Sequence, residues 1–358
     1  MGRRDMIENY PSDTDVFSVV SEKMSYSNVR DFYQRRGILY IANKRLEIAS
    51  NSCRLFLGEN DYEEMRKNTI TKKNYKKISG VELNSSKNIQ EIASILTDKR
   101  GSCLDERTNL HITEVITAQN NTVQCKVEYI SKNIGTVDLL KNENNTCEFQ
   151  IETKEDRKLI LTHHEKNEDY AKILEIFNII SSDLEEPEKI TPRIITLDHF
   201  SIEQKIELFD RILTYQFEDF HSENVISIKI RKGDSDDEGE VTNQDLKGIN
   251  EAILRGDNLR TNEFVKKFEC SGYYFYGIIL KLGHKRNPIK IMLEIFFKHK
   301  PPLPEINIKD TFEIIDDKEE KKLLPDHEQK KYLKDFWEVL TKIYFDYIEE
   351  IRGINNTE

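Results

Sequence analysis

Apolar positions in the first hundred residues recur at the spacing of an α-helix. Between the expected N-cap Ser27 and the expected C-cap Gly37, the residues Val29, Phe32 and Tyr33 fall on one helical face. The same period predicts further helices over residues 15–23, 44–57, 61–67 and 89–96. The N-terminal part of the chain is therefore expected to be helical.

From residue 111 the pattern changes its period to two. Polar and apolar residues alternate over 123–129, 147–151 and 159–161, which is typical of antiparallel strands with one face in water. An amphipathic helix is predicted over 167–180. The acidic stretch 181–191 contains a proline and is the expected linker.

The last third of the chain repeats this order of strands and helices. Ser201 and Gln204 have the spacing of a capping box and predict the start of a helix. A long helix is predicted to begin at Asp326. Between them the pattern predicts a strand over 225–231, short helices over 246–254 and 263–268, and a hairpin formed by 273–282 and 288–297.

Together these elements predict an α+β protein. We expect a small basic helical module over residues 1–80, an α+β middle domain over 81–185, and an α+β C-terminal domain over 192–358 that carries the hairpin and the final helix.

Charge is distributed unevenly along the chain. The 358 residues carry a net charge of −11, but residues 1–100 contain 18 Lys and Arg against 14 Asp and Glu, a net of +4 that leaves −15 for the rest. Such asymmetry predicts a polyanion partner for the N-terminal end. The acidic remainder is expected to bind protein partners or to self-associate into a homo-oligomer.

Several classes of protein are disfavoured by composition. No apolar run approaches the 18 residues of a membrane span, and the N-terminus lacks the apolar core of a secretory signal. The five cysteines are widely spaced without a C-x-x-C pair, which is typical of reduced thiols. A cytoplasmic protein without membrane contact is therefore expected.

The N-terminal segment also resembles a known DNA-binding motif. Residues 29–38 resemble the first helix of the SAP motif with its Lys-Arg-Gly-Leu ending, and 44–46 resemble the Lys-x-x-Leu start of its second helix. The likeness covers residues 27–56, and it departs from the family where Ala42 replaces the central glycine and where the leucine comes about one residue early. This resemblance implies sequence-tolerant duplex binding with phosphate contacts from Arg35, Arg36, Lys44 and Arg45.

A second basic cluster follows at once. No acidic residue lies between residues 65 and 81. Cationic clusters bind nucleic acids by releasing counterions from the phosphate backbone, and Tyr75 within this one could stack on a base. The expected contacts are Arg66, Lys67, Lys72, Lys73, Lys76 and Lys77, with Lys285 and Arg286 at the tip of the predicted hairpin. Protein docking by the same surface and a merely solvated hairpin are the alternatives.

Two metal-like patterns are interpreted as chance. His163 and His164 stand beside Glu165 and Glu168, but adjacent residues of a strand point to opposite faces and do not easily share one ion. Residues 234–245 approach a calcium loop, but the twelfth position is Asp and a strand is predicted before the loop. No metal site is expected.

A metal-dependent nuclease is the enzymatic alternative. Glu294 and Asp310 with Lys298 or Lys300 approximate the acid and Glu-x-Lys arrangement of restriction-type nucleases, with the lysine displaced by two residues. Phosphate-loop, dinucleotide-binding and hydrolase motifs are absent from the sequence, so no cofactor and no catalytic residue is predicted.

These patterns favour a non-enzymatic DNA-binding subunit of a bacterial multi-component system. The Lys- and Asn-rich composition suggests a bacterial source, and a phage-defence setting is a hypothesis drawn from the type of chain. Besides the nuclease, a protein–protein adaptor is the other hypothesis.

Overall fold

The chain forms an α+β fold, as the sequence predicts, with helices and an antiparallel sheet whose strands differ in length. The computed structural model describes residues 11–42, 44–69, 76–118, 122–132, 140, 142–154, 157–164, 166–185, 188–233, 249–256, 259, 262–299, 302–316 and 318–355. Two compact units are present: the first comprises 1–73, 101–113 and 127–146, and the second comprises 74–100, 114–126 and 147–358.

The first unit has a helical core. Its helical segments are α1 (Asp13–Ser18), the π-helical turn η1 (Val19–Lys23), α2 (Tyr26–Gln34), α3 (Arg45–Ser52) and α4 (Glu59–Thr69). Twelve buried residues form one apolar cluster, among them Val20, Phe32 and Ile48. Burial of these side chains, more than helix propensity, holds such short helices in place.

Two helix boundaries of the first unit differ from the sequence prediction. The N-cap of α2 is Ser25 instead of Ser27, because the Ser25 hydroxyl accepts the hydrogen bond from the backbone N–H of Asn28 at 3.2 Å. Helix α3 ends at Ser52 instead of continuing to Gly58. The chain turns there, which brings Leu57 into the core at 3 % exposure.

The second unit contains most of the sheet. Its helices are α5 (Ile89–Asp98), α6 (Asn167–Ser182), α7 (Ile202–Thr214), α8 (Glu263–Cys270) and α9 (Asp326–Asn355). The strands are β1 (Lys77–Asn84), β2 (His111–Ala118), β3 (Thr122–Lys132), β4 (Asn142–Lys154), β5 (Arg157–His164), β6 (Thr191–Arg193), β7 (Phe220–Lys232), β8 (Glu251–Arg255), β9 (Tyr273–His284), β10 (Ile289–His299), β11 (Pro302–Ile315) and β12 (Lys318–Lys321). Residues 111–113 of β2, 127–132 of β3 and 142–146 of β4 belong to the first unit.

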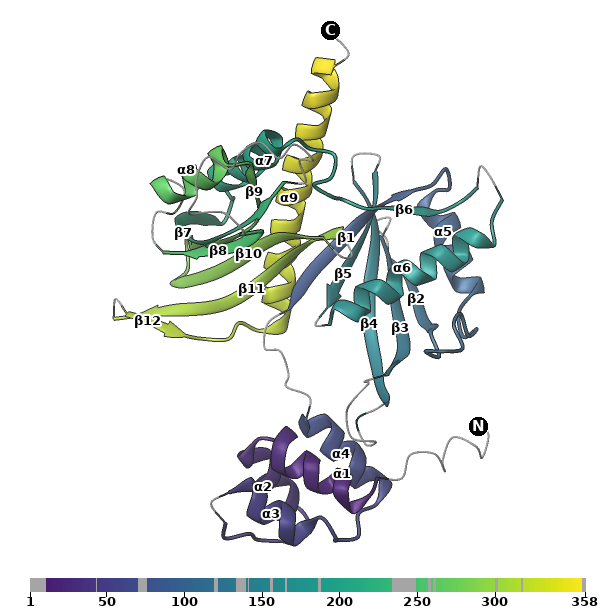
Figure 1. Ribbon diagram of the computed structural model, residues 1–358. Helices are drawn as coiled ribbons and strands as arrows, with labels where there is room; N and C mark the ends of the chain where they lie inside the picture. Colours follow the sequence, from purple (N-terminus) through teal and green to yellow (C-terminus); the bar gives the residue numbers. More distant parts are fainter. Residues whose placement is uncertain are drawn as a thin grey trace. The chain divides into compact units, whose positions relative to one another are not determined.

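The strands follow the order β2-β3-β4-β5-β1-β11-β10-β9-β7-β8, with β12 paired to β11 and β6 paired to β1 (Figure 1). Strand β1 therefore joins the β2–β5 strands to the β7–β11 strands. The three domain ranges expected from the sequence do not coincide with these units, because β1 spans residue 80 and pairs with both β5 and β11.

Helix α9 lies along β1 and β11 and packs against α7 (Figure 1). Its Trp337 is fully buried beneath Gly80 of β1. A Cβ atom at residue 80 would stand 2.6 Å from Cζ2 of Trp337 and 2.7 Å from the carbonyl oxygen of Ile160. Only glycine permits this close approach between strand and helix.

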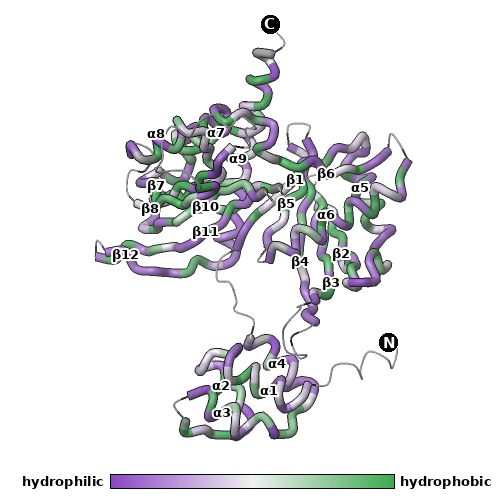
Figure 2. The backbone as a smooth tube through the Cα atoms, viewed as in Figure 1, coloured by the Kyte–Doolittle hydropathy of each residue, from purple (hydrophilic) through white to green (hydrophobic). Residues whose placement is uncertain are grey.

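One core runs along the α9 side of strands β7–β11. On β10, Leu293, Ile295 and Phe297 belong to this core, so the period of two places Glu294 and Lys298 on the opposite face. The alternating apolar and polar positions of these strands can be followed in Figure 2. None of the helices that the structure describes meets the length and hydropathy of a membrane span.

The helix predicted over 246–254 is wrong in its described part. Residues 251–255 form β8, in which Ala252 and Leu254 pack against the core while Ile253 between them faces outward. Strands β11 and β12 had no counterpart in the sequence prediction. Within the expected linker 181–191, Ile190 is fully buried and Thr191 begins β6.

Candidate functional site

Arg36 of the predicted SAP-like motif is an internal structural residue of the first unit. Its guanidinium donates to Asp61 Oδ1 at 2.8 Å and to the carbonyl oxygen of Phe32 at 2.7 Å, and it also pairs with Glu64. It stacks over the Phe32 ring with 3.6 Å to the ring centroid. These contacts clamp α2 to α4 and leave little of the charge for a phosphate.

The other basic residues of that motif have different surroundings. Arg35 pairs with Glu64 at 3.3 Å but keeps 73 % of its side chain exposed. Arg45 donates to the carbonyl oxygen of Met24, and Arg66 pairs with Glu63. Lys44 is exposed at the start of α3 and forms no salt bridge among the described residues. Of the four basic residues predicted to contact phosphates, only Lys44 and Arg35 are therefore well exposed on the surface.

The described helices of the first unit carry no net charge. Residues 11–69 contain nine Lys and Arg against nine Asp and Glu. The positive balance of the N-terminal hundred residues thus comes from the acid-free segment beyond Arg66. Lys72, Lys73 and the side chain of Lys67 lie outside the described residues.

The remaining predicted contacts belong to the second unit. Lys76 pairs with Asp326 at 3.5 Å and Lys77 with Glu305 at 2.8 Å. The Lys285 ammonium donates to the carbonyl oxygens of Phe217 at 2.7 Å and Glu218 at 2.8 Å, which anchors the hairpin turn. Arg286 is exposed at that turn.

Large apolar side chains are exposed on the first unit. Ten large apolar side chains are exposed among the described residues, and six of them fall between residues 26 and 56. They are Tyr26, Leu39, Ile41, Leu46, Leu55 and Phe56, and Ile41 and Phe56 are the most exposed, at 105 % and 92 %.

The link between α2 and α3 explains how two of them point outward. Ile38, Tyr40 and Ala42 pack against the helical core, so the residues between them, Leu39 and Ile41, face away from it. The Tyr26 hydroxyl donates to the carbonyl oxygen of Ala42, which holds the link in place. We call Leu39, Ile41, Leu46 and Phe56 the apolar set.

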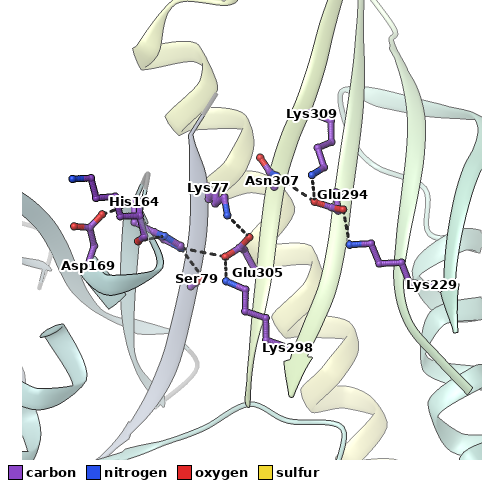
Figure 3. A network of polar contacts seen from close by, with 11 residues as sticks. Lys77, Ser79, His164, Asp169, Lys229, Glu294, Lys298, Glu305, Asn307 and Lys309 are labelled. Carbon is purple, nitrogen blue, oxygen red and sulfur yellow. Dashed lines mark hydrogen bonds and ion pairs between the residues drawn. The ribbon is translucent and has the colours of Figure 1, made fainter. Parts of the chain in front are cut away.

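A buried polar network occupies the face of the second unit's sheet opposite the core (Figure 3). Its centre is Glu305 of β11, which is fully buried. Lys77 of β1 donates to Glu305 Oε1 at 2.8 Å, and Lys298 of β10 donates to Oε2. Burial acts to raise the pKa of Glu305, but the hydrogen bonds from the two lysines outweigh it and hold the pKa below its ordinary value.

His164 of β5 extends the network. Its Nδ1 lies 3.0 Å from the carbonyl oxygen of Lys166, which can only accept, so Nδ1 carries the proton. Nε2 then accepts from the Ser79 hydroxyl at 2.9 Å. Burial lowers the pKa of His164 to about 4, so the imidazole is neutral at pH 7.

A second carboxylate repeats the arrangement on the neighbouring strands. Lys229 and Lys309 each approach Glu294 at 2.8 Å, and the Asn307 amide donates to it at 3.2 Å. The Lys229 ammonium also lies 4.3 Å from the centroid of Phe296, and Lys298 lies 5.6 Å from the same ring. Phe296 thus stands between the two carboxylate clusters.

The contacts of this network fit a structural role better than that of a nuclease active site. Two lysines already occupy Glu294, and Lys298 serves Glu305 instead of a metal-bound phosphate. Asp310 pairs with Lys321 at 2.9 Å, and Lys300 lies outside the described residues. No group of three or more potential metal ligands occurs among the described residues. Glu165 and the calcium-like segment 234–245 are not described.

The network was missed in the sequence because its members come from separate strands. Its signal is the alternation of polar with core residues over 305–309, together with Glu294 and Lys298 beside the core residues of 293–297.

Comparison with known proteins identifies no family. No family model and no curated protein matches the chain. One solved structure, that of DynU16 from the dynemicin biosynthetic locus, covers 76 % of this chain and 98 % of its own, at 7 % identity and a TM-score of 0.21. A similarity at this level carries no argument about fold or function.

Proposed function

We propose that this protein acts by binding and not by catalysis, and that its helical unit docks on a partner protein. The observation that carries this proposal is the apolar set, which exposes large side chains on a unit with a complete core of its own. Exposed apolar side chains gathered on one small unit are typical of protein interfaces. The neutral charge of the described helices agrees with a protein partner better than with a polyanion.

The docking proposal predicts that Ile41→Ser combined with Phe56→Ser abolishes a specific partner complex. Loss of the two most exposed apolar side chains from an interface costs about 2 kcal/mol or more, which is about 30-fold in Kd. Proteins that co-purify with the full chain from its own cells would be quantified for the native and the variant protein. The affinity of the leading partner would then be measured by calorimetry with purified components.

Ile253→Ser is the matched control, because Ile253 is 52 % exposed and lies on β8 of the second unit. The control should retain the partner. Equal recovery of every partner by the native protein and the double variant would contradict the proposal. Circular dichroism checks that the double variant is folded, and a loss of the partner that is explained by unfolding alone would also contradict the proposal. Light scattering of the pure protein measures its molar mass and so shows whether the apolar set binds a second copy of this chain.

Nucleic-acid binding is the second candidate, and the acid-free segment 65–81 favours it. With Arg66, Lys76 and Lys77 engaged by acids, Lys67, Lys72 and Lys73 would supply most of the attraction from this segment. Gel shifts with duplex DNA, single strands and RNA at 50 and 200 mM salt test this candidate. Lys72→Glu with Lys73→Glu should remove a salt-sensitive shift, whereas Lys342→Glu should not. Cleavage in a parallel Mg²⁺ arm would favour the nuclease instead.

A further inference from the structure

The second unit contains a cavity that neither proposed function uses. Its volume is about 490 Å³, within the range of small-molecule sites. Its walls come from β2, β3, β4 and β5 and from the first turns of α9, elements labelled in Figure 1. Ile116, Gln124, Gln150, His163, Lys331 and Lys334 are the lining residues on which its chemistry depends.

The sheet presents a polar face to this cavity. Glu148 pairs in register with His163, and Gln150 pairs with Leu161, so these four residues share one face. The alternate residue Phe149 belongs to the other face, where its ring lies 5.6 Å from that of Phe177 of α6. The cavity therefore combines two amides and an imidazole with apolar surface from Leu161 and from Ile116, which is 47 % exposed.

Cations outnumber acids on the cavity wall. Four lysines line it against two glutamates, Glu114 and Glu148. Lys334 pairs with Glu152 at 2.8 Å, and Lys330 lies 3.8 Å from Glu148. Lys331 is exposed and forms no salt bridge within the part of the chain that the structure describes. The α9 side of the cavity is thus suited to an anionic group.

His163 lines the cavity and has one hydrogen-bonding atom without a partner among the described groups. This atom, Nδ1, is buried. Buried polar atoms of side chains are normally paired, so an unpaired one calls for a ligand or a bound water. Burial, with smaller contributions from Lys330 and other charged neighbours, lowers the pKa of His163 to about 4, so the ring is neutral at pH 7 and can donate through one nitrogen and accept through the other.

We infer that this cavity binds a small organic anion with the chemistry of a mononucleotide. The phosphate lies against Lys331 and its neighbours on α9. The amide of Gln124 and the amide oxygen of Gln150, whose nitrogen donates to Glu152 at 3.1 Å, hydrogen-bond the polar edge of a planar base. Four adjacent strands, β2 to β5, span roughly 14 Å at about 4.8 Å per step, which matches the length of a nucleoside monophosphate. Ile116, on the far strand, covers the base.

Calorimetric titration of the full chain with AMP, GMP, CMP and UMP tests this inference. At least one of the four should bind with one-to-one stoichiometry, and Lys331→Glu should weaken that binding at least tenfold. Lys342→Glu, an exposed lysine of the same helix outside the cavity lining, is the matched control and should leave the affinity unchanged. The nucleoside of the nucleotide that binds, which lacks the phosphate, should bind at least tenfold more weakly than that nucleotide.

His163→Leu provides an independent readout, because it removes the unpaired nitrogen without a charge change. The substitution should weaken the binding of the nucleotide. It should leave the binding of inorganic phosphate unchanged, because phosphate binds only at the lysines. Failure of all four nucleotides to bind at millimolar concentration would overturn the inference. Binding that Lys331→Glu does not weaken would also overturn it. Neither result bears on the apolar set, which belongs to the first unit.

Discussion

Replacement of Glu305 by glutamine is expected to lower the free energy of unfolding by about 3–5 kcal/mol. The change keeps the shape of the side chain but leaves Lys77 and Lys298, which are 16 % and 17 % exposed, without their carboxylate. Burial lowers the pKa of Lys298 below its ordinary value, whereas the hydrogen bond to Glu305 acts to raise it, so loss of the carboxylate removes the main interaction that favours the ammonium. Urea unfolding of the native and variant proteins at pH 7 measures the loss.

Glu319→Gln is the matched control for Glu305→Gln. Glu319 also pairs with two lysines, Lys281 at 2.7 Å and Lys290 at 3.2 Å, but its side chain is 34 % exposed. Exposed pairs contribute about 1 kcal/mol or less, so the control should change stability little. Adding Lys298→Met to Glu305→Gln should restore part of the loss, because it removes a largely buried charge that has lost its carboxylate. Equal losses for Glu305→Gln and Glu319→Gln would show that burial does not govern this network.

Acid is expected to destabilise the protein well above the pH at which carboxylates titrate. Burial lowers the pKa of His163 and of His164 to about 4, whereas an unfolded histidine takes up its proton near pH 6.5. Between these two pH values the unfolded chain binds more protons than the folded chain, so the free energy of unfolding falls as the pH falls. The stabilisation is complete above pH 6.5, and each histidine taken alone loses about 2 kcal/mol of it by pH 5.

Urea unfolding at pH 7, 6 and 5 measures this pH dependence. His163→Gln and His164→Gln should each reduce the loss between pH 7 and pH 5. His327→Gln is the control, because the side chain of His327 is 82 % exposed. A stability that stays constant from pH 7 to pH 5 would contradict the neutral state of both imidazoles.

The sequence by itself determined the class of fold and most of the elements. Capping boxes such as that of Ser201, and runs of period two such as 147–151, depend on neighbours along the chain and can be recognised without tertiary contacts. It also predicted the long C-terminal helix from Asp326. Its errors, such as the helix predicted where β8 forms, arose where pairing with a distant strand overrides local preference.

Only the tertiary structure decided which charges are available to a partner. A lysine or an arginine has the same appearance in the sequence whether it faces water or a buried acid. Arg36 is neutralised by Asp61, 25 positions away, and Lys77 by Glu305, 228 positions away, so spacing along the chain could not reveal either pair. The sheet order likewise assembles the cavity from strands and a helix far apart in the sequence, because cavities and ion pairs depend on distances in space, which hydropathy and charge patterns do not contain.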